Sequence, residues 1–337
     1  MHRDAAAIHG TNDSIVDRLP SFVPIRITSG VDRYGFSSVL AKQCGRRIVP
    51  RSFANWVHSW MWHEEPTDEL LVCDQLPREV TIIVRNEKER LAIEAAGFGD
   101  VRIGGLPFAY VQRQHELRYT DALLAFPPHS AESEKVIAEQ GAYLDYLESL
   151  KQDFESVYVS VYYLDMGGAM HKAALARGLR VIQGAHPDDA NCLLRMRSIL
   201  DSFMHVTSNV MGSHMLYALF SGCKFSFCGP IYGYDESVYL GGGNPHGLSS
   251  DYVRQIIELY SEPYLSERFG RFFVSNPRMG IQDTHFAEDL IGKRFVMAPH
   301  QIEDALGWGV LGQMRGYMTG VRRRLARSIV SRMPSQQ

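Results

Sequence analysis

The feature that most constrains the fold is a regular alternation of short apolar segments and helical segments between residues 121 and 230. Segments rich in apolar and β-branched residues have the length of buried strands, and they fall at 122–126, 157–164, 179–183, 204–207 and 224–228. Helices are expected between them, at 131–153, 171–177, 192–203 and 215–220. Such an alternation is typical of a doubly wound, mostly parallel α/β sheet.

The first part of the chain shows the same alternation less regularly. We expect strands at 22–27, 80–84 and 101–103 and helices at 37–43 and 87–96. The 337 residues exceed the size at which one hydrophobic core normally stops growing. We therefore predict two α/β lobes, at 1–115 and 116–300, with a hinge within 105–120 and a C-terminal segment at 301–337.

Composition excludes several classes of protein. A formal charge of −3 and a pI near 6.5 give no nucleic-acid footprint, so we expect no nucleic-acid partner. The five cysteines are far apart and form no CxxC pair, which disfavours both a disulfide framework and a zinc site. There is no apolar signal core and no apolar run of about 18 residues. We expect a cytoplasmic protein, or one attached to the inner face of the cell membrane.

The C-terminal segment is strongly basic. Residues 305–337 contain six arginines and no acidic residue. A helix through 312–333 would place apolar side chains on one face, namely Met314, Tyr317, Met318, Val321, Leu325 and Ile329. A basic amphipathic helix of this kind suits an anionic membrane surface. The alternative is a terminal helix that packs on its own domain.

Polar residues and glycines follow the predicted strands of the second lobe. Ligands of open parallel sheets bind beyond the carboxyl ends of the strands, so these loops converge on one candidate site. The most informative loop runs from Thr207 to Ser213 and leads into a helix, whose N–H groups and dipole suit a phosphate. A plain helix N-cap is the alternative interpretation. The candidate residues of the four loops are His129, Ser130, His186, Ser208, Asn209, Gly212, Ser213, His214 and Gly229.

The first lobe offers candidates for a general base. Asp32 lies in a glycine-flanked loop, and the stretch 53–65 holds three tryptophans, two histidines and two acids. Aromatic faces stack on sugar rings, and a nearby histidine or carboxylate can accept a proton. We consider Asp32, His58 and Glu64 as bases, with a packing cluster of aromatic residues as the alternative. No Asp-x-Asp, P-loop or dinucleotide fingerprint occurs, so no dedicated metal site is indicated.

The second lobe resembles GT-B glycosyltransferases of bacterial capsule and lipopolysaccharide biosynthesis. The likeness rests on the Pro128-His129-Ser130 turn, the stretch 207–219, and a strand ending in Gly229-Pro230, and it covers residues 120–235. His186-Pro187 and Thr207-Ser208 are similar to motifs of sialyl- and Kdo-transferases of this fold, although their separation is shorter here.

The resemblance implies two Rossmann-like lobes of GT-B type, followed here by the basic amphipathic helix. The C-terminal lobe would bind the nucleotide sugar through the loop residues given above together with Tyr217, and the N-terminal lobe would bind the acceptor. It further implies catalysis without a bound metal or other cofactor.

We therefore expect a glycosyltransferase that moves a sugar from a nucleotide-sugar donor to a polysaccharide or lipid-linked glycan. Asp32 or His58 would deprotonate the acceptor hydroxyl, and His129, Ser208 and Ser213 would stabilise the departing phosphate. Three alternatives stay open: a CDP-alditol phosphotransferase or a UDP-sugar epimerase on the same fold, or a non-catalytic scaffold of a polysaccharide assembly complex.

Overall fold

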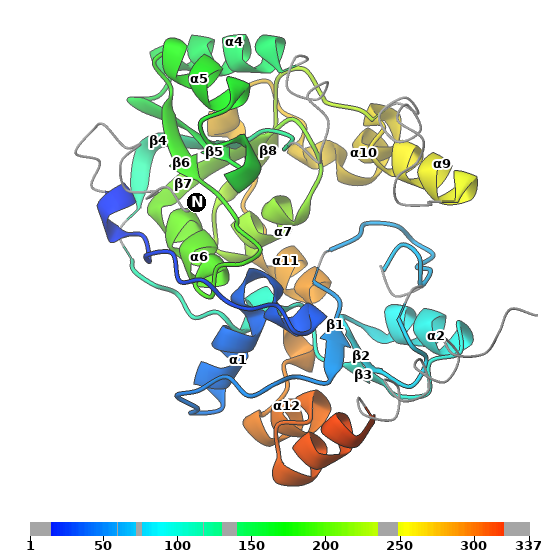
Figure 1. The fold of residues 1–337 in the computed structure, drawn as a ribbon. Coiled ribbons are helices and arrows are strands. Elements are labelled where there is room, and N and C mark those ends of the chain that lie inside the picture. The colour runs from blue at the N-terminus through cyan, green and yellow to red at the C-terminus, as the bar shows by residue number, and fades with distance from the viewer. Residues whose placement is uncertain are drawn as a thin grey trace, which may run out of the picture.

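The computed structural model describes residues 15–58, 60–71, 76–116, 118–129, 140–234 and 249–319 and contains two parallel β-sheets (Figure 1). The first sheet has the order β1 (Ala54–Trp56), β2 (Thr81–Val84), β3 (Val101–Ile103). The second has the order β6 (Arg180–Gln183), β5 (Ser156–Val161), β4 (Tyr119–Phe126), β7 (Phe203–Ser208), β8 (Lys224–Phe227). The predicted α/β class with parallel sheets is confirmed.

The second sheet is doubly wound, as the alternation predicts. From β4 the chain builds β5 and β6 on one side, and it then crosses back to build β7 and β8 on the other. The strand order therefore reverses between β4 and β7. Alternate residues of the strands face opposite layers, which explains their continuous apolar runs. Leu123 and Ala125 pack with α4 (Gly141–Ser149) and α5 (Ala169–Ala176), whereas Leu124 packs with α6 (Cys192–Ser202) and α7 (Ser213–Phe220).

The first sheet carries α1 (Phe36–Gln43) and α2 (Glu87–Ala95) close to their predicted positions. In the described part of the chain after the second sheet, helices are formed by α9 (Ser250–Leu259), α10 (Glu262–Phe269), α11 (Thr284–Ile291), α12 (Pro299–Leu306) and residues 310–319. Short 3₁₀ helices are η2 (Val16–Arg18), η3 (Gly30–Gly35), η4 (Pro107–Tyr110), η5 (Leu150–Gln152), η6 (Tyr163–Asp165), η7 (Gly270–Phe272), η8 (Pro277–Met279) and η9 (Lys293–Phe295). Among the described residues no helix is both long and apolar enough to cross a membrane.

After the second sheet the chain returns to the first. The Phe53 N–H donates to Leu306 O at 3.1 Å, and α12 forms ion pairs to Arg46 through Glu303 and to Arg102 through Asp304, both at 2.6 Å. Residues far away in the sequence thus pack against the first sheet. The lobe limits at residues 115 and 300 stay a prediction.

The predicted strand at 22–27 is wrong. This segment is extended, but within the described residues its ladder pairing is limited to one bridge between Pro24 and Asp189, beside the loop that follows β6. The Ala190 N–H also donates to Val23 O at 2.8 Å. Pro24 has no N–H to give to a ladder, so the segment lies along a loop of the second sheet instead of entering the first. The strand that the sequence analysis missed is β1.

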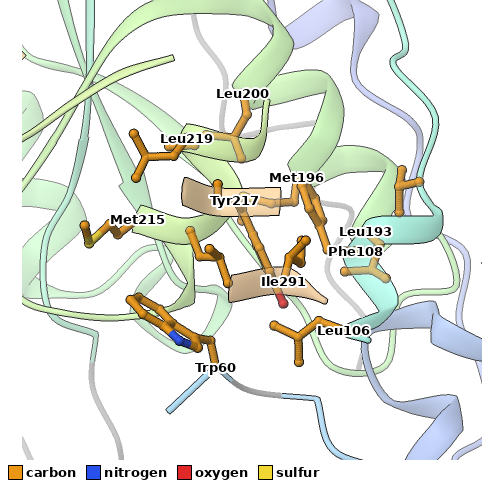
Figure 2. Close-up of a cluster of buried hydrophobic side chains, with 14 of the residues drawn as sticks. Trp60, Leu106, Phe108, Leu193, Met196, Leu200, Met215, Tyr217, Leu219 and Ile291 are labelled. Carbon is orange, nitrogen blue, oxygen red and sulfur yellow. The ribbon is translucent and has the colours of Figure 1, made fainter. Parts of the chain in front are cut away.

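The predicted hinge is not an exposed linker over residues 106–111. Leu106 and Phe108 are fully buried, and the Phe108 ring stacks on Tyr217 of α7 with centroids 4.1 Å apart. Figure 2 shows Phe108 and Leu106 among side chains of α6, α7 and α11, with Trp60 beside them. Gly105 has φ +69°, and a Cβ there would lie 2.7 Å from Gly292 O. The glycine allows two backbones to meet where the halves of the molecule share one core.

Candidate active site

A cavity of about 310 Å³ lies at the carboxyl edge of the second sheet. One wall comes from the residues that end or follow β4, Phe126 to His129, and from those that follow β7, Val210 to His214. These are the two strands between which the strand order reverses. Open α/β sheets bind ligands at such a switch point, so the cavity stands where the topology predicts a site.

The opposite wall comes from the first part of the chain. Tyr34 and Phe36 line it, and so do residues of the segment that follows β1, with His58, Trp60, Met61 and Trp62 at the cavity. Elements of the second half hold this segment in place. The Trp60 N–H donates to Ser213 Oγ at 3.0 Å, and Trp62 Nε1 donates to Leu259 O at 2.7 Å. The cavity is therefore enclosed between both halves of the molecule.

The wall of the cavity is aromatic and, over the described residues, contains no lysine, arginine, aspartate or glutamate. A ligand would be held there by stacking, hydrogen bonds and backbone dipoles rather than by ion pairs. Its tyrosine, histidine and tryptophan side chains are Tyr34, Tyr162, Tyr217, Tyr234, Tyr260, His58, His129, His214, Trp60 and Trp62.

The N-terminus of α7 supplies the clearest polar feature of the wall. Gly212 is the N-cap, and Gly212, Ser213 and His214 all line the cavity. The first N–H groups of a helix lack intrahelical partners and carry partial positive charge. A Cβ at Gly212 would lie 2.8 Å from Nδ1 of His214, so a glycine is needed for the His214 ring to pack against this turn. The arrangement suits a phosphate group.

His214 is held neutral beside this helix end. Its Nε2 lies 3.1 Å from Val210 O, and its ring stacks on Phe126 at 5.1 Å. A carbonyl oxygen only accepts, so Nε2 carries the proton and Nδ1 keeps its lone pair. Burial lowers the pKa of His214 to about 3, with Val210 opposing the change and His129 adding to it. The ring thus contributes an acceptor to the wall but no charge.

Of the three candidate bases, only His58 lines the cavity. Its ring lies 5.7 Å from that of Tyr34 and 6.2 Å from that of Phe36. Burial, helped by the charge of Arg33, lowers the pKa of His58 to about 4. The imidazole is therefore unprotonated at neutral pH and able to accept a proton.

Asp32 and Glu64 lie outside the described cavity wall. Asp32 is buried, and its Oδ2 accepts hydrogen bonds from Thr28 N and Thr28 Oγ1 at 2.8 Å and from Ser29 N at 3.0 Å. Glu64 is exposed and pairs with Arg268 at 2.8 Å, which lowers the pKa of the carboxyl group. Asp32 therefore stabilises the turn before η3, and Glu64 forms an ion pair at the surface.

Four of the predicted donor-binding residues hold the loops together instead of lining the cavity. Ser208 Oγ lies 2.6 Å from Phe126 O and accepts from Val210 N at 3.2 Å, which ties β7 to β4. Asn209 Nδ2 donates to Pro230 O at 2.9 Å, and His186 Nδ1 accepts from Asp188 N at 3.1 Å. Gly229 has φ +79° and packs under Tyr146.

The remaining predicted residues fall into two groups. Gly212, Ser213, His214 and Tyr217 lie together at the cavity, with His129 exposed at its rim, 4.5 Å from the Tyr162 ring. Ser130 lies outside the described residues. Across the described ranges no three His, Cys, Asp or Glu side chains come together as a metal site would need, and metal independence stays a prediction.

The sequence analysis missed Tyr34 and Tyr162. Among the described residues, Tyr34 is the single non-glycine residue with positive φ, at 58°, and its backbone N–H donates to Pro187 O at 2.7 Å. The hydroxyl groups of Tyr34 and Tyr162, one from each half of the molecule, are close enough that each affects the pKa of the other. A positive φ is unfavourable for a tyrosine, so the surrounding contacts must hold Tyr34 in this position beside the cavity. The adjacent Gly35 is the one local signal for this turn.

No protein-family model and no curated protein matches the sequence. Among solved structures, the chain is similar to an S. aureus TarM mutant in complex with fondaparinux, α-GlcNAc-glycerol and UDP. That alignment has a TM-score of 0.34 and 11% identity over 75% of this chain and 49% of that one. A second crystal structure of TarM gives a TM-score of 0.31 and 10% identity over 79% of this chain and 49% of that one. The chain spans about half the length of the TarM chains. Both TM-scores are low, so this likeness does not establish a function for the chain.

Proposed function

We propose that this chain is a glycosyltransferase that moves a sugar from a nucleotide-sugar donor to a glycan acceptor. The observation that carries the proposal is one cavity at the switch point of a doubly wound sheet, with its opposite wall supplied by the first half of the chain. A donor with a phosphate would bind on the sheet side, and an acceptor hydroxyl would approach from the other side. A transferase needs both positions within one enclosed space.

The donor phosphate would bind at the N-terminus of α7. The backbone N–H groups of Ser213 and His214 begin this helix, and the absence of a side chain at Gly212 keeps the His214 ring in place beside them. Charge develops on the leaving phosphate as the glycosidic bond breaks, and fixed N–H dipoles in an enclosed site stabilise that charge without reorganising. The tyrosine and tryptophan rings of the wall would stack on the sugar and the base.

His58 would act as the general base. The negative charge of a bound donor would raise the pKa of a nearby imidazole, and burial otherwise holds the pKa of His58 at about 4. His58 would then accept the proton of the acceptor hydroxyl as its oxygen bonds to the anomeric carbon and the bond to the phosphate breaks. The aromatic wall would exclude water and so limit hydrolysis of the donor.

The proposal also covers the glycan that receives the sugar and the place of the chain in the cell. We assign the reaction to a bacterial surface polysaccharide or a lipid-linked glycan, without a catalytic metal. The acid-free segment at 312–333 would contact the anionic inner face of the cell membrane. Its part from residue 320 onward lies outside the described residues.

A thermal-shift screen with UDP-, GDP-, CMP- and CDP-linked compounds tests the proposed function. A ligand at about 100 times its Kd stabilises the folded state by about 2.7 kcal/mol, which raises the Tm by several degrees. We expect one nucleotide class to do so with the wild-type chain. Gly212→Ala would abolish the effect, because the new Cβ displaces His214 at the helix end.

The matched control is Gly99→Ala, since a Cβ at Gly99 meets nothing within 4 Å. This variant should keep the full response to the nucleotide. No stabilisation of the wild-type chain by any nucleotide would reject the proposal in favour of a scaffold. Product analysis with the stabilising compound then separates sugar transfer from phospho-alditol transfer and from epimerisation.

A further inference from the structure

Two acid-free segments, distant in sequence, meet on one face of the molecule. Residues 33–63 contain five lysines and arginines and no acid, and residues 305–337 contain six arginines and no acid. In the structure Trp308 Nε1 donates to Ser52 Oγ at 3.0 Å, and Gln313 Nε2 donates to Arg51 O at 2.8 Å. The face lies at the bottom of Figure 1, where α12 and the helix at 310–319 adjoin the first sheet.

The helix at 310–319 is docked by one side and presents apolar side chains on the other. Its docked side includes Gly316, which packs against the Phe53 ring, and Tyr317, whose ring lies 5.4 Å from that of Phe53. Its free side carries Val310, Met314 and Met318 at helical spacing, which are 78%, 58% and 56% exposed. An apolar stripe with this spacing is a continuous surface and not a scatter of single residues.

The loop 45–51, whose Arg51 O accepts from Gln313 Nε2 of the helix, also carries an exposed apolar side chain. Ile48 is 82% exposed and follows Arg46 and Arg47 in the loop 45–51. Leu311, 69% exposed, lies at the start of the helix. We define the basic face as the loop 45–51 together with the helix 310–319.

The basic face carries positive charges, which would attract an anionic surface. Arg47 and Arg315 are exposed, and the guanidinium of Arg51 lies 5.5 Å from the Phe53 ring centre. The nearest acids on α12, Glu303 and Asp304, are engaged by Arg46 and Arg102. Apolar side chains bordered by arginines suit a bilayer interface, because the apolar groups enter the acyl boundary while the cations remain at the phosphates.

We propose that the basic face binds anionic lipid as one unit, so that the first sheet itself rests on the membrane surface. This extends the membrane contact proposed for 312–333 to the loop at 45–51, which no amphipathic pattern marks. It rests on that contact and is independent of sugar transfer. Each additional arginine near the surface and each inserted apolar side chain adds to the partition coefficient.

Flotation of the full chain with vesicles tests the basic face. Vesicles of equal parts phosphatidylglycerol and phosphatidylcholine should carry the wild-type chain at low salt, and vesicles of pure phosphatidylcholine should not. The double variant Ile48→Ser/Met314→Ser, with both sites exposed, should bind the anionic vesicles about tenfold more weakly. Its Tm should equal that of the wild-type chain. Leu175→Ser, at an equally apolar site that is 51% exposed on α5, should bind normally.

Two results would overturn the inference. The first is unchanged vesicle binding by Ile48→Ser/Met314→Ser, which would leave any binding to the arginine tail alone. The second is a wild-type chain that ignores vesicles but forms dimers lost in the double variant, which would make the face a protein interface. The nucleotide thermal shift, measured without vesicles, stays unaffected in either case and so separates this inference from the proposed function.

Discussion

The cavity contains histidines that burial keeps neutral. Burial lowers the pKa of His58 to about 4 and that of His214 to about 3, and it also lowers the pKa of His63, which lies outside the cavity wall, to about 4. A neutral imidazole leaves the wall without charge, so that the phosphate of the proposed donor would be the largest charge in the occupied site. The same burial makes the folded chain sensitive to acid, since the unfolded chain protonates first.

We predict that stability falls as the pH drops from about 6.5 toward 4. Each folded-state pKa lies below the ordinary value of 6.5, so the stability is fully present above pH 6.5 and is lost as the pH falls through the folded values. The free energy of unfolding should decrease by about 1.4 kcal/mol per pH unit and per histidine. Urea denaturation at a series of pH values measures the slope.

His214→Phe should make this slope shallower, because the ring still stacks on Phe126 but no longer titrates. The exposed His285→Gln is the control, and it should leave the slope in place because it retains the three buried rings. An equal slope in His214→Phe and the wild-type chain would contradict the assignment.

The loop and helix start that contain Ser208 and Ser213 illustrate how far the sequence predicts the site. Residues 207–213 were expected to bind a phosphate, and their place at the sheet edge follows from the order of strands and helices. The order of strands and helices does not specify where each side chain points. It therefore cannot tell which of the two serine hydroxyl groups reaches the cavity. Ser208 is turned toward Phe126 O, whereas Ser213 lies on the cavity wall and accepts from Trp60 N.

We predict different consequences for the two serines. Ser208→Ala should lower the free energy of unfolding by about 1–2 kcal/mol, because the side-chain bond from Ser208 Oγ to Phe126 O of β4 and the bond from Val210 N within the loop are lost, yet it should retain nucleotide stabilisation. Ser213→Ala leaves the Trp60 N–H without its acceptor, so hydrogen exchange in the segment that contains Trp60 should become faster and nucleotide stabilisation weaker. A Ser208→Ala protein that responds to nucleotide as poorly as Ser213→Ala would refute the distinction.

At the level of elements, the sequence predicted the second sheet better than the first. Strands buried on both faces, such as β4 and β5, appear as continuous apolar runs that helices separate. β1 is the three residues Ala54–Trp56 inside an aromatic stretch, which is too short to show a period. Residues 22–27 have the pattern of a strand, but a local pattern does not specify a partner, and Pro24 prevents a full ladder.

At the scale of the whole molecule, the largest buried cluster of the described residues crosses between the two sheets. Trp56 and Ile83 of the first sheet, Phe108 of the junction and Tyr217 of α7 belong to the same buried cluster. The sequence pattern does not indicate that the two sheets share this cluster. The spacing of apolar residues shows which face of an element is apolar, but it does not show which other element covers that face. The two sheets are therefore expected to unfold together.

We predict a single calorimetric transition for the wild-type chain. Phe108→Ala should lower the free energy of unfolding by about 3–5 kcal/mol, because it removes the ring that stacks on Tyr217 inside the shared core. Leu164→Ala, at a site that is 53% exposed, is the control and should change little. Two separate transitions in the wild-type chain would show that the shared core does not couple the sheets.

The uncharged wall of the cavity has a consequence for the response to ionic strength. Salt screens exposed charges over about 8–10 Å, but it screens buried dipoles far less. Affinity for a donor held by the α7 N-terminus and by aromatic rings would thus change little as salt is added, whereas attachment through exposed arginines would decrease steeply. Added salt would then release the chain from a bilayer without preventing it from binding the proposed donor.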